Sequence, residues 1–579
     1  MNITWKIGGE AGFGIMTTGV MFSKLATRHG YHIFDYVEFP SLIRGGHNVY
    51  EVCVGDEDTH SQEKNIDVLF ALNQETIDKH KNELKSGGII VYDPDLMKVD
   101  PQEFTSKKII LYPAPLAKIV KDNNLLKVME NNVALGITAG IFGMDINILN
   151  SLIADTFSEK GDKIILPNQQ AAKLGFDYVV KNPPQGFDRK LIKRTAQPKI
   201  VITGNEAYVL GAIASGCKFY AAYPMTPMAA ALVYMAEVGP KYGVVVKHAE
   251  DEISVINMAI GASYTGVRSM INTAGGGFSL MVEGLGLAGI TETPLVIVMA
   301  QRPGPATGLP TYTGQGDLKF LINASQDEFP RVILAPGDVE EAFYLTVEAF
   351  NIADKLQTPV FVLVDKFLCE SHKSAPIFDQ TKITIDRGNL LSKEIGDTVE
   401  NYMRYQDTPS GISPRNLPGM KKAIATINSY EHTEYGFSTE DITDRIKQVE
   451  KRNRKLDSYK TTILKPTKYG DENAQVTLIA WGSTKGPILQ ALKRLKSENF
   501  NQTVNFIHLN HVWPLPKEAL IEELNKCQKV LLVEGNSQAQ MASLIREQTG
   551  IEIKNKLLKY DGRPFYPEEI IEKIKEISI

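Results

Sequence analysis

The chain has 579 residues, which is enough for three or four domains with large cores. Its formal net charge of −5 provides no basic field, so nucleic-acid binding is not expected. No apolar run approaches the roughly 18 to 20 residues of a membrane-spanning helix. The N-terminus also lacks the basic region and apolar core of a secretory signal. We therefore expect a cytoplasmic protein that does not enter a membrane.

The four cysteines are scattered and include no CxxC pair: Cys53, Cys217, Cys369 and Cys527. Iron–sulfur clusters and structural zinc sites are normally held by closely spaced Cys or His ligands. We therefore expect this chain to hold no metal by itself. Sparse, unpaired thiols also fit a reducing compartment.

The chain opens with a predicted strand (Ile3–Ile7), a glycine-rich turn (Gly8–Gly14) and a predicted helix (Met16–Arg28). A glycine-rich turn between a strand and a helix suits an anion bound at the helix N-terminus. The spacing GxxGxG differs from the dinucleotide fingerprint GxGxxG, so NAD binding is not predicted.

A second loop, FPSLIRGGHN at residues 39–48, places Arg44 beside Gly45. Backbone N–H groups and a guanidinium together suit a phosphate or a carboxylate. A tight turn with a solvated arginine explains the pattern about equally well. Gly12, Gly14, Arg44 and Gly45 are the candidate anion-binding residues of this region.

A proline-containing segment, Lys181–Lys190, reads as a linker, and a new domain is predicted to open with the strand that begins at Lys199. Beyond it, apolar strands and helices alternate. Examples are a helix at Ile253–Tyr264 and strands at Ser269–Thr273 and Pro294–Ala300. This alternation is typical of a parallel sheet covered by helices.

Three acidic residues, Glu250, Asp251 and Glu252, precede the apolar helix. A carboxylate that enters a buried helix is costly unless something uses it. Taken alone, Glu252 is better explained as a carboxylate that the helix dipole favours. The neighbouring motifs reverse that preference.

Two loops complete this region. In YPMTP, the two prolines fix the backbone around Thr226 and hold its hydroxyl in a defined place. In QRPGPATGLPT, Arg302 ends a predicted buried strand, where it can bind a carboxylate through two parallel hydrogen bonds. The alternative is a salt bridge from Arg302 to a neighbouring domain.

The remainder of the chain is less informative. Residues 371–470 are polar and irregular, with a charged helix predicted on the surface at Thr439–Lys455. From about Ala474 the segments VTLIAWGST, VNFIHLNHVWPLP and KVLLVEGNSQAQ are predicted strands with helices between them.

These motifs together resemble one family over nearly the whole chain, from Gly8 to Phe565. GGEAGFGI and PSLIRGGHN resemble its gamma domain. YPMTP, the helix motif ExxxxxxAxGAS that begins at Glu252, GPATGLPT and DGRPF resemble its alpha subunit. The family is the 2-oxoacid:ferredoxin oxidoreductases whose alpha subunit carries a fused N-terminal gamma domain. The chain departs from the family's TSGPG turn at Ala274 and Gly276, and Ala306 replaces a serine.

The resemblance implies a multidomain α/β fold. The expected parts are a Rossmann-like gamma domain (1–185), a linker (186–197), a pyrimidine-binding thiamine-diphosphate domain (198–375), an interdomain connection (376–470) and a transketolase C-terminal-like domain (471–579). It also implies oxidative decarboxylation of a 2-oxoacid to an acyl-coenzyme A, with electrons passed to ferredoxin. The fused form favours 2-oxoglutarate or a broad range of 2-oxoacids over strict use of pyruvate.

The resemblance also implies roles for particular residues. Glu252 is the expected catalytic residue and faces N1′ of the cofactor's aminopyrimidine. Arg302 and Thr226 are expected to bind the substrate, with Tyr223 and Pro224 in the same loop. The expected cofactor-binding residues are Glu252, Gly275, Gly276, Gly277, Thr307 and Gly308. Coenzyme A is one candidate for the anion of the gamma domain, whose ligand the sequence leaves open.

Half of the active site is missing from this chain. The diphosphate of thiamine diphosphate is normally bound through Mg²⁺ at a GDG motif followed by an asparagine, and no GDG occurs here. A partner beta subunit is therefore expected to supply the Mg²⁺ site and the [4Fe-4S] cluster, in a dimer of gamma-alpha/beta heterodimers.

Two alternatives stay open. The first is a subunit of another thiamine-diphosphate enzyme that has no cluster, which the visible absorbance of the complex would distinguish. The second is a non-catalytic scaffold that binds coenzyme A or a nucleotide through GGEAGFGI. Titration of the complex with thiamine diphosphate would distinguish that alternative.

Overall fold

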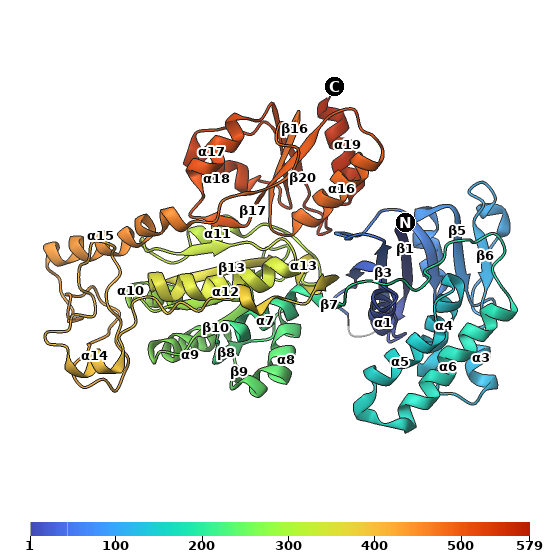
Figure 1. Ribbon diagram of the computed structural model, residues 1–579, viewed down its shortest axis with the longest axis horizontal. Helices are drawn as coiled ribbons and strands as arrows, with labels where there is room; N and C mark the ends of the chain where they lie inside the picture. The colour runs from blue at the N-terminus through green and yellow to red at the C-terminus, as the bar shows by residue number, and fades with distance from the viewer. Residues whose placement is uncertain (1, 43–44, 579) are drawn as a thin grey trace. The chain divides into compact units, whose positions relative to one another are not determined.

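The computed structural model describes residues 2–42 and 45–578, and these form three β-sheets with covering helices (Figure 1). The chain folds into two compact units. Unit 1 comprises the chain up to Thr203 together with Glu370–Ile377 and Tyr566–Ile570. Unit 2 comprises Gly204–Cys369, Phe378–Phe565 and the chain from Ile571 onward.

The sheet of unit 1 is mixed. Its strands are β1 (Asn2–Ala11), β2 (His32–Glu38), β3 (Gly45–Gly55), β4 (Ile66–Ala71), β5 (Leu84–Tyr92), β6 (Ile110–Pro113), β7 (Lys199–Thr203) and β14 (His372–Pro376), in the order β6-β5-β4-β1-β3-β2-β14-β7. The half β6-β5-β4-β1 is parallel, as in a Rossmann-like domain. In the other half, β3 runs antiparallel to both β1 and β2.

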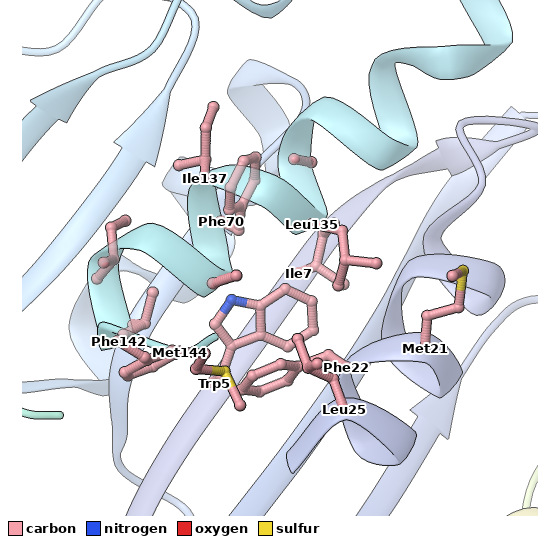
Figure 2. Close-up of a cluster of buried hydrophobic side chains, with 14 of the residues drawn as sticks. Trp5, Ile7, Met21, Phe22, Leu25, Phe70, Leu135, Ile137, Phe142 and Met144 are labelled. Atoms are coloured by element: carbon pink, nitrogen blue, oxygen red, sulfur yellow. The ribbon is translucent and has the colours of Figure 1, made fainter. Parts of the chain in front are cut away.

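The helices of unit 1 are α1 (Ile15–Arg28), α2 (Gln74–His80), α3 (Leu116–Asp122), α4 (Glu130–Phe142), α5 (Ile146–Thr156) and α6 (Asp162–Lys181). Aromatic side chains from β1, α1 and α4 meet in the core, as Figure 2 shows. The rings of Trp5 and Phe22 lie 4.8 Å apart, and those of Phe22 and Phe142 lie 5.6 Å apart. Burial of such large side chains stabilises the unit. Helix α1 agrees within one residue with the helix predicted at Met16–Arg28.

Strand β7 differs from its prediction as the opening strand of the second domain. It pairs antiparallel with β14, which the chain reaches only about 170 residues later, for example with Ile202 opposite Lys373. Strand β14 in turn joins β2, where the Ile33 N–H donates to Ser374 Oγ (2.9 Å). Such a pairing between distant segments leaves no local signal in the sequence. The domain boundaries proposed from the sequence remain a prediction.

The larger sheet of unit 2 contains β8 (Phe219–Ala222), β9 (Val245–His248), β10 (Ser269–Ala274), β11 (Leu295–Gln301), β12 (Val332–Leu334), β13 (Pro359–Asp365) and β18 (His511–Trp513). Its order is β18-β12-β13-β11-β10-β8-β9, and every pair is parallel except β12 with β18. The parallel sheet predicted from the alternation is therefore present. The two strands predicted at residues 269–273 and 294–300 match β10 and β11 to within a residue.

The helices associated with this sheet are α7 (Gly204–Ala214), α8 (Ala229–Val238), α9 (Glu252–Tyr264), α10 (Gly275–Ile290), α11 (Leu318–Ile322), α12 (Val339–Leu356) and α13 (Lys366–Glu370). In parallel sheets the loops that follow the strands gather at one edge, where ligands bind. The loops after β8, β9, β10 and β11 carry Tyr223, Glu252, Gly275 and Arg302, so the topology gathers the candidate residues there.

The third sheet contains β15 (Thr467–Gly470), β16 (Val476–Trp481), β17 (Val504–Leu509), β19 (Lys529–Glu534) and β20 (Asn555–Leu558), in the order β15-β17-β16-β19-β20. The helices of this region are α16 (Lys485–Ser497), α17 (Lys517–Asn525), α18 (Gln540–Thr549) and α19 (Pro567–Ser578). Single-turn 3₁₀ helices lie at Lys81–Glu83, Pro101–Phe104, Lys127–Met129, Ser158–Lys160, Gly239–Tyr242, Gln380–Lys382, Lys460–Thr462 and Gly482–Thr484.

The connection between the last two sheets contains α14 (Lys393–Thr398) and α15 (Ile442–Tyr459). We expected α15 to be a surface helix, and this is wrong for one of its faces. Lys451 and Lys455 are fully buried and form ion pairs with Glu292, each at 2.6 Å. The charged composition of α15 therefore reflects a buried ionic cluster as well as a solvated face.

Within the described residues, no helix is both long enough and apolar enough to cross a lipid bilayer. In the same part of the chain, no group of three or more His, Cys, Asp or Glu side chains is arranged to hold a metal ion. None of the four cysteines, all of which lie in the described part of the chain, forms a disulfide.

Candidate active site

The three acidic residues at the start of α9 have different environments. Asp251 caps the helix, because its Oδ1 accepts a hydrogen bond from the Ser254 N–H (2.7 Å). Glu250 is exposed, and its Oε1 accepts from Ser254 Oγ (2.8 Å). Glu252 is only 3% exposed, and its Oε1 has no hydrogen-bond partner among the described residues. Of the three, Glu252 is therefore the carboxylate that still requires a partner.

The triple glycine lies where β10 ends and α10 begins, and it has little room for side chains. A β-carbon on Gly277 would lie 2.3 Å from Thr273 Oγ1 and 2.4 Å from Glu252 Oε1. A β-carbon on Gly275 would lie 2.9 Å from Asp317 Oδ2. Gly276 is open, with its nearest neighbour, the carbonyl oxygen of Ala306, 3.9 Å from the same position. The turn therefore has the Glu252 carboxylate beside Gly277 and the Asp317 carboxylate beside Gly275, and it is open at Gly276.

The loop YPMTP (residues 223–227) follows β8 and is held by hydrogen bonds at its C-terminal end. Pro227 and Met228 accept hydrogen bonds through their carbonyl oxygens from the side-chain amides of Asn205 (2.9 Å) and Asn272 (3.2 Å). The other end of the loop is open, with Tyr223 37% exposed and Pro224 also exposed. The loop is thus fixed by hydrogen bonds at its C-terminal end and exposed to solvent at Tyr223 and Pro224.

Arg302 follows the end of β11 and contacts this loop. Its Nη1 donates to the carbonyl oxygen of Thr226 (2.8 Å), so the structure brings together the two residues expected to bind substrate. Burial lowers the pKa of Arg302, and the nearby Asp317 carboxylate opposes that shift. The remaining N–H donors of the guanidinium are suited to a second, anionic partner.

The segment that contains Thr307 and Gly308 is exposed. Gly308 has φ +54°, and a β-carbon there would lie 1.8 Å from the carbonyl oxygen of Pro303. That carbonyl also accepts the Leu309 N–H (3.0 Å), so only glycine fits this turn. The geometry accounts for Gly308 as a turn residue, and the cofactor-binding role of Thr307 and Gly308 stays a prediction.

The candidate anion-binding residues of unit 1 lie where β1 ends and β3 begins. Ala11 pairs with Gly45 in the sheet, which brings the two glycine-rich loops together. The spaces beside Gly12 and Gly45 are open, whereas a β-carbon on Gly14 would clash with the side chain of Asn131. Gly14 therefore allows α4, which carries Asn131, to pack closely against the start of α1. Arg44, the fourth candidate, lies outside the described residues.

Two polar residues of the region were missed. Asp317 follows Gln315 and Gly316 in a stretch without a recognisable motif, yet its carboxylate reaches the triple glycine. Thr311 is buried, and its Oγ1 has no hydrogen-bond partner among the described residues. An unpaired hydroxyl or carboxylate of this kind becomes visible only in three dimensions.

Three family models match the chain. One described as "Pyruvate flavodoxin/ferredoxin oxidoreductase, thiamine diP-bdg" matches residues 210–451, and one described as "Pyruvate ferredoxin/flavodoxin oxidoreductase" matches residues 4–178. The third, "Transketolase, C-terminal domain", matches residues 467–561. The fold and these matches define a chain of a thiamine-diphosphate-dependent oxidoreductase, and they confirm the predicted multidomain α/β fold.

Individual relatives narrow the class. The chain is 34% identical to a 2-oxoacid:ferredoxin oxidoreductase subunit alpha from a Sulfolobus species, over 100% of this chain and 97% of that protein. It is 32% identical to a 2-oxoglutarate synthase subunit KorA from Archaeoglobus fulgidus, over 65% of this chain and 98% of that one. The chain belongs to the family of 2-oxoacid:ferredoxin oxidoreductase alpha subunits.

A solved structure agrees with this assignment. The 2-oxoglutarate:ferredoxin oxidoreductase of Magnetococcus marinus, solved with 2-oxoglutarate, coenzyme A and succinyl-CoA bound, superposes with a TM-score of 0.92. The two chains are 32% identical, and the match covers 99% of each.

The residues of unit 2 fit one end of thiamine diphosphate. The buried, unpaired Oε1 of Glu252 can share a proton with a ring nitrogen, and a planar ring can approach the turn at Gly276, where the nearest atom to a β-carbon position is a backbone oxygen 3.9 Å away. Glu252 and Gly275–Gly277 are the residues that would hold it.

Proposed function

We propose that this chain supplies the aminopyrimidine side and the substrate-carboxylate side of an active site that oxidatively decarboxylates 2-oxoglutarate. The observation that carries the proposal is the buried Glu252, with one unpaired oxygen beside a glycine turn. The names of the Magnetococcus marinus and Archaeoglobus fulgidus relatives support 2-oxoglutarate, whereas the Sulfolobus relative is named for 2-oxoacids in general.

The cofactor carries the difficult chemistry: when bound, thiamine diphosphate supplies the nucleophilic carbon and retains the electrons left when carbon dioxide departs. The contribution of Glu252 is to hold a proton between its Oε1 and N1′ of the aminopyrimidine. Burial keeps water away from that proton. Gly277 leaves the room that this carboxylate occupies, since a β-carbon there would lie 2.4 Å from Glu252 Oε1.

Arg302 and Thr226 recognise the substrate in this proposal. The guanidinium is fixed at Nη1, which donates to the Thr226 carbonyl, and its other N–H groups donate to the 2-oxoacid carboxylate. The hydroxyl of Thr226 donates to the 2-oxo group. Tyr223 and Pro224 line the accessible edge of the same loop.

A partner beta subunit completes the site. It would provide the Mg²⁺ that binds the diphosphate and a [4Fe-4S] cluster that passes electrons to ferredoxin. Ile253 on α9 and Leu280 on α10 are 52% and 53% exposed, whereas Val255, Ile256 and Phe278 of the same two helices are buried. Exposed apolar side chains next to an incomplete site are consistent with a partner surface.

Coenzyme A is proposed to bind through the open glycine loops of unit 1, at Gly12 and Gly45, with Arg44 as a further candidate. The assembled enzyme is proposed to be a dimer of gamma-alpha/beta heterodimers.

The first prediction tests the function. We expect the chain expressed alone to show no 2-oxoacid-dependent dye reduction, because it lacks the residues for the diphosphate site. Co-expressed with its beta subunit, it should reduce a viologen dye with 2-oxoglutarate and coenzyme A. The kcat/KM should be higher for 2-oxoglutarate than for pyruvate or 2-oxobutyrate. Activity of the chain alone, or equal use of all three acids, would contradict the respective part of the proposal.

The second prediction concerns Arg302. Loss of a charge-assisted hydrogen bond in a closed site should cost about 2 to 4 kcal/mol of transition-state binding. Arg302→Ala should therefore lower kcat/KM for the 2-oxoacid by roughly 30- to 1000-fold in the assembled complex. The matched control is Arg445→Ala, which removes an exposed arginine paired with Asp327 and Glu431. Equal effects of the two substitutions would remove Arg302 from the binding role.

A further inference from the structure

A second carboxylate lies on the glycine turn, and the proposed mechanism does not use it. Glu252 lies beside Gly277, at one end of the turn, and Asp317 lies beside Gly275, at the other. Both side chains occupy space that any residue larger than glycine would fill. The turn therefore admits two acidic groups, whereas proton transfer at the aminopyrimidine needs only one.

Asp317 is held in place through its backbone. Its N–H donates to Gln301 Oε1 (3.1 Å), and its carbonyl oxygen accepts the Leu321 N–H (3.0 Å) in α11. Its carboxylate, in contrast, caps no helix and makes no hydrogen bond or ion pair within the described part of the chain. Gln301 is the residue immediately before Arg302, so one hydrogen bond ties the position of Asp317 to that of the arginine.

Arg302 is the cation that acts on Asp317. Burial raises the pKa of Asp317 to about 6, and the positive charge of Arg302 opposes the rise. Each group shifts the pKa of the other, but the two form no ion pair within 4.0 Å among the described residues. Ionising a largely buried carboxylate that has no hydrogen-bond partner costs free energy, so the ionised form of Asp317 depends on the positive charge of Arg302.

We propose that Asp317, when ionised, competes with the 2-oxoacid carboxylate for the positive charge of the Arg302 guanidinium. This inference rests on the proposed function of Arg302. Two carboxylates near one guanidinium repel each other, so substrate binding favours the protonated form of Asp317, with the proton taken from solvent.

The charged neighbours of Asp317 determine how the KM for the 2-oxoacid changes with pH. Arg302 faces it from the end of β11, and Glu252 faces the same turn from α9. Lys319 points elsewhere, because its Nζ donates to Ser543 Oγ (2.7 Å). Below pH 6 Asp317 is neutral and Arg302 is available to the substrate. As the pH rises through about 6, Asp317 ionises, so the KM for the 2-oxoacid should rise by about fivefold or more.

The test uses the assembled complex and measures kcat and KM for 2-oxoglutarate between pH 5.5 and 8. In the unmodified enzyme KM should rise across this range, since the substrate carboxylates stay ionised throughout. In Asp317→Asn, KM should be flat with pH and about fivefold lower at pH 8. In an Arg302→Gln background, which removes the charge, Asp317→Asn should have a much smaller effect on KM.

Three results would overturn the inference. They are a flat KM profile in the unmodified enzyme, a KM of Asp317→Asn that is raised or keeps the original pH dependence, and the same effect of Asp317→Asn with arginine or glutamine at position 302. The first is measured without any substitution, so it stands even if Asp317→Asn folds poorly. If the unmodified complex oxidises no 2-oxoacid at all, the proposed function itself fails, which is a different outcome.

Discussion

Replacing Glu252 with glutamine is expected to lower kcat/KM for the 2-oxoacid by about 10³- to 10⁴-fold in the assembled complex. Glutamine keeps the size and planarity of the side chain, so it should fit beside Thr273 and Gly277 and still allow the cofactor to bind. It cannot exchange a proton with N1′ of the aminopyrimidine. The expected defect is therefore in proton transfer, while cofactor occupancy stays close to that of the unmodified complex.

The direct measurement is deuterium exchange at the thiazolium carbon of the bound cofactor, which should be far slower in Glu252→Gln. Glu250→Gln is the matched control. Glu250 is an exposed carboxylate two residues away, and its side chain accepts a hydrogen bond from Ser254 Oγ. Normal exchange in Glu252→Gln with a collapse in Glu250→Gln would assign the role to Glu250. Loss of bound cofactor in Glu252→Gln would instead indicate a structural role.

The parts of the site that the sequence predicts are those with a local signal. Helix α9 and strands β10 and β11 were expected within a residue or so of their observed bounds, because apolar periodicity depends on neighbouring residues. The choice of Glu252 among three acidic residues came from the resemblance, because its spacing to Ala259, Gly261 and Ala262 fits the family's helix. The structure distinguishes it from Glu250 and Asp251 by its burial. Parallel topology then explains why the candidate loops share one edge.

The parts that were missed depend on contacts between distant residues. Asp317 reaches the turn at Gly275 across 42 positions of sequence, and only the folded backbone brings them together. The pairing of β7 with β14 is a similar case. In α15, the pattern of charges correctly predicted a polar helix but gave no sign that some of those charges are buried, since a paired and a solvated lysine look alike in a sequence.

The second large effect is expected at that buried cluster. Glu292 is fully buried and accepts from Lys451 Nζ and Lys455 Nζ, while its carbonyl oxygen accepts from Arg404 Nη2 (2.8 Å). Burial alone would raise the pKa of Glu292, but Lys451, Lys455 and Arg404 hold it well below its usual value. The carboxylate is therefore the counter-charge for three cations that anchor α15 and the connecting segment to the end of α10.

Glu292→Gln should destabilise unit 2 by about 3 to 5 kcal/mol, because it leaves buried cations without a counter-charge. Tryptophan fluorescence during urea unfolding can report the loss, since Trp481 is buried in this unit. Glu283→Gln removes an exposed carboxylate from α10, the helix that ends just before Glu292, and should change stability by no more than about 0.5 kcal/mol. If the unfolding midpoints of the two variants were equally close to that of the unmodified chain, the cluster would not be what holds α15 in place.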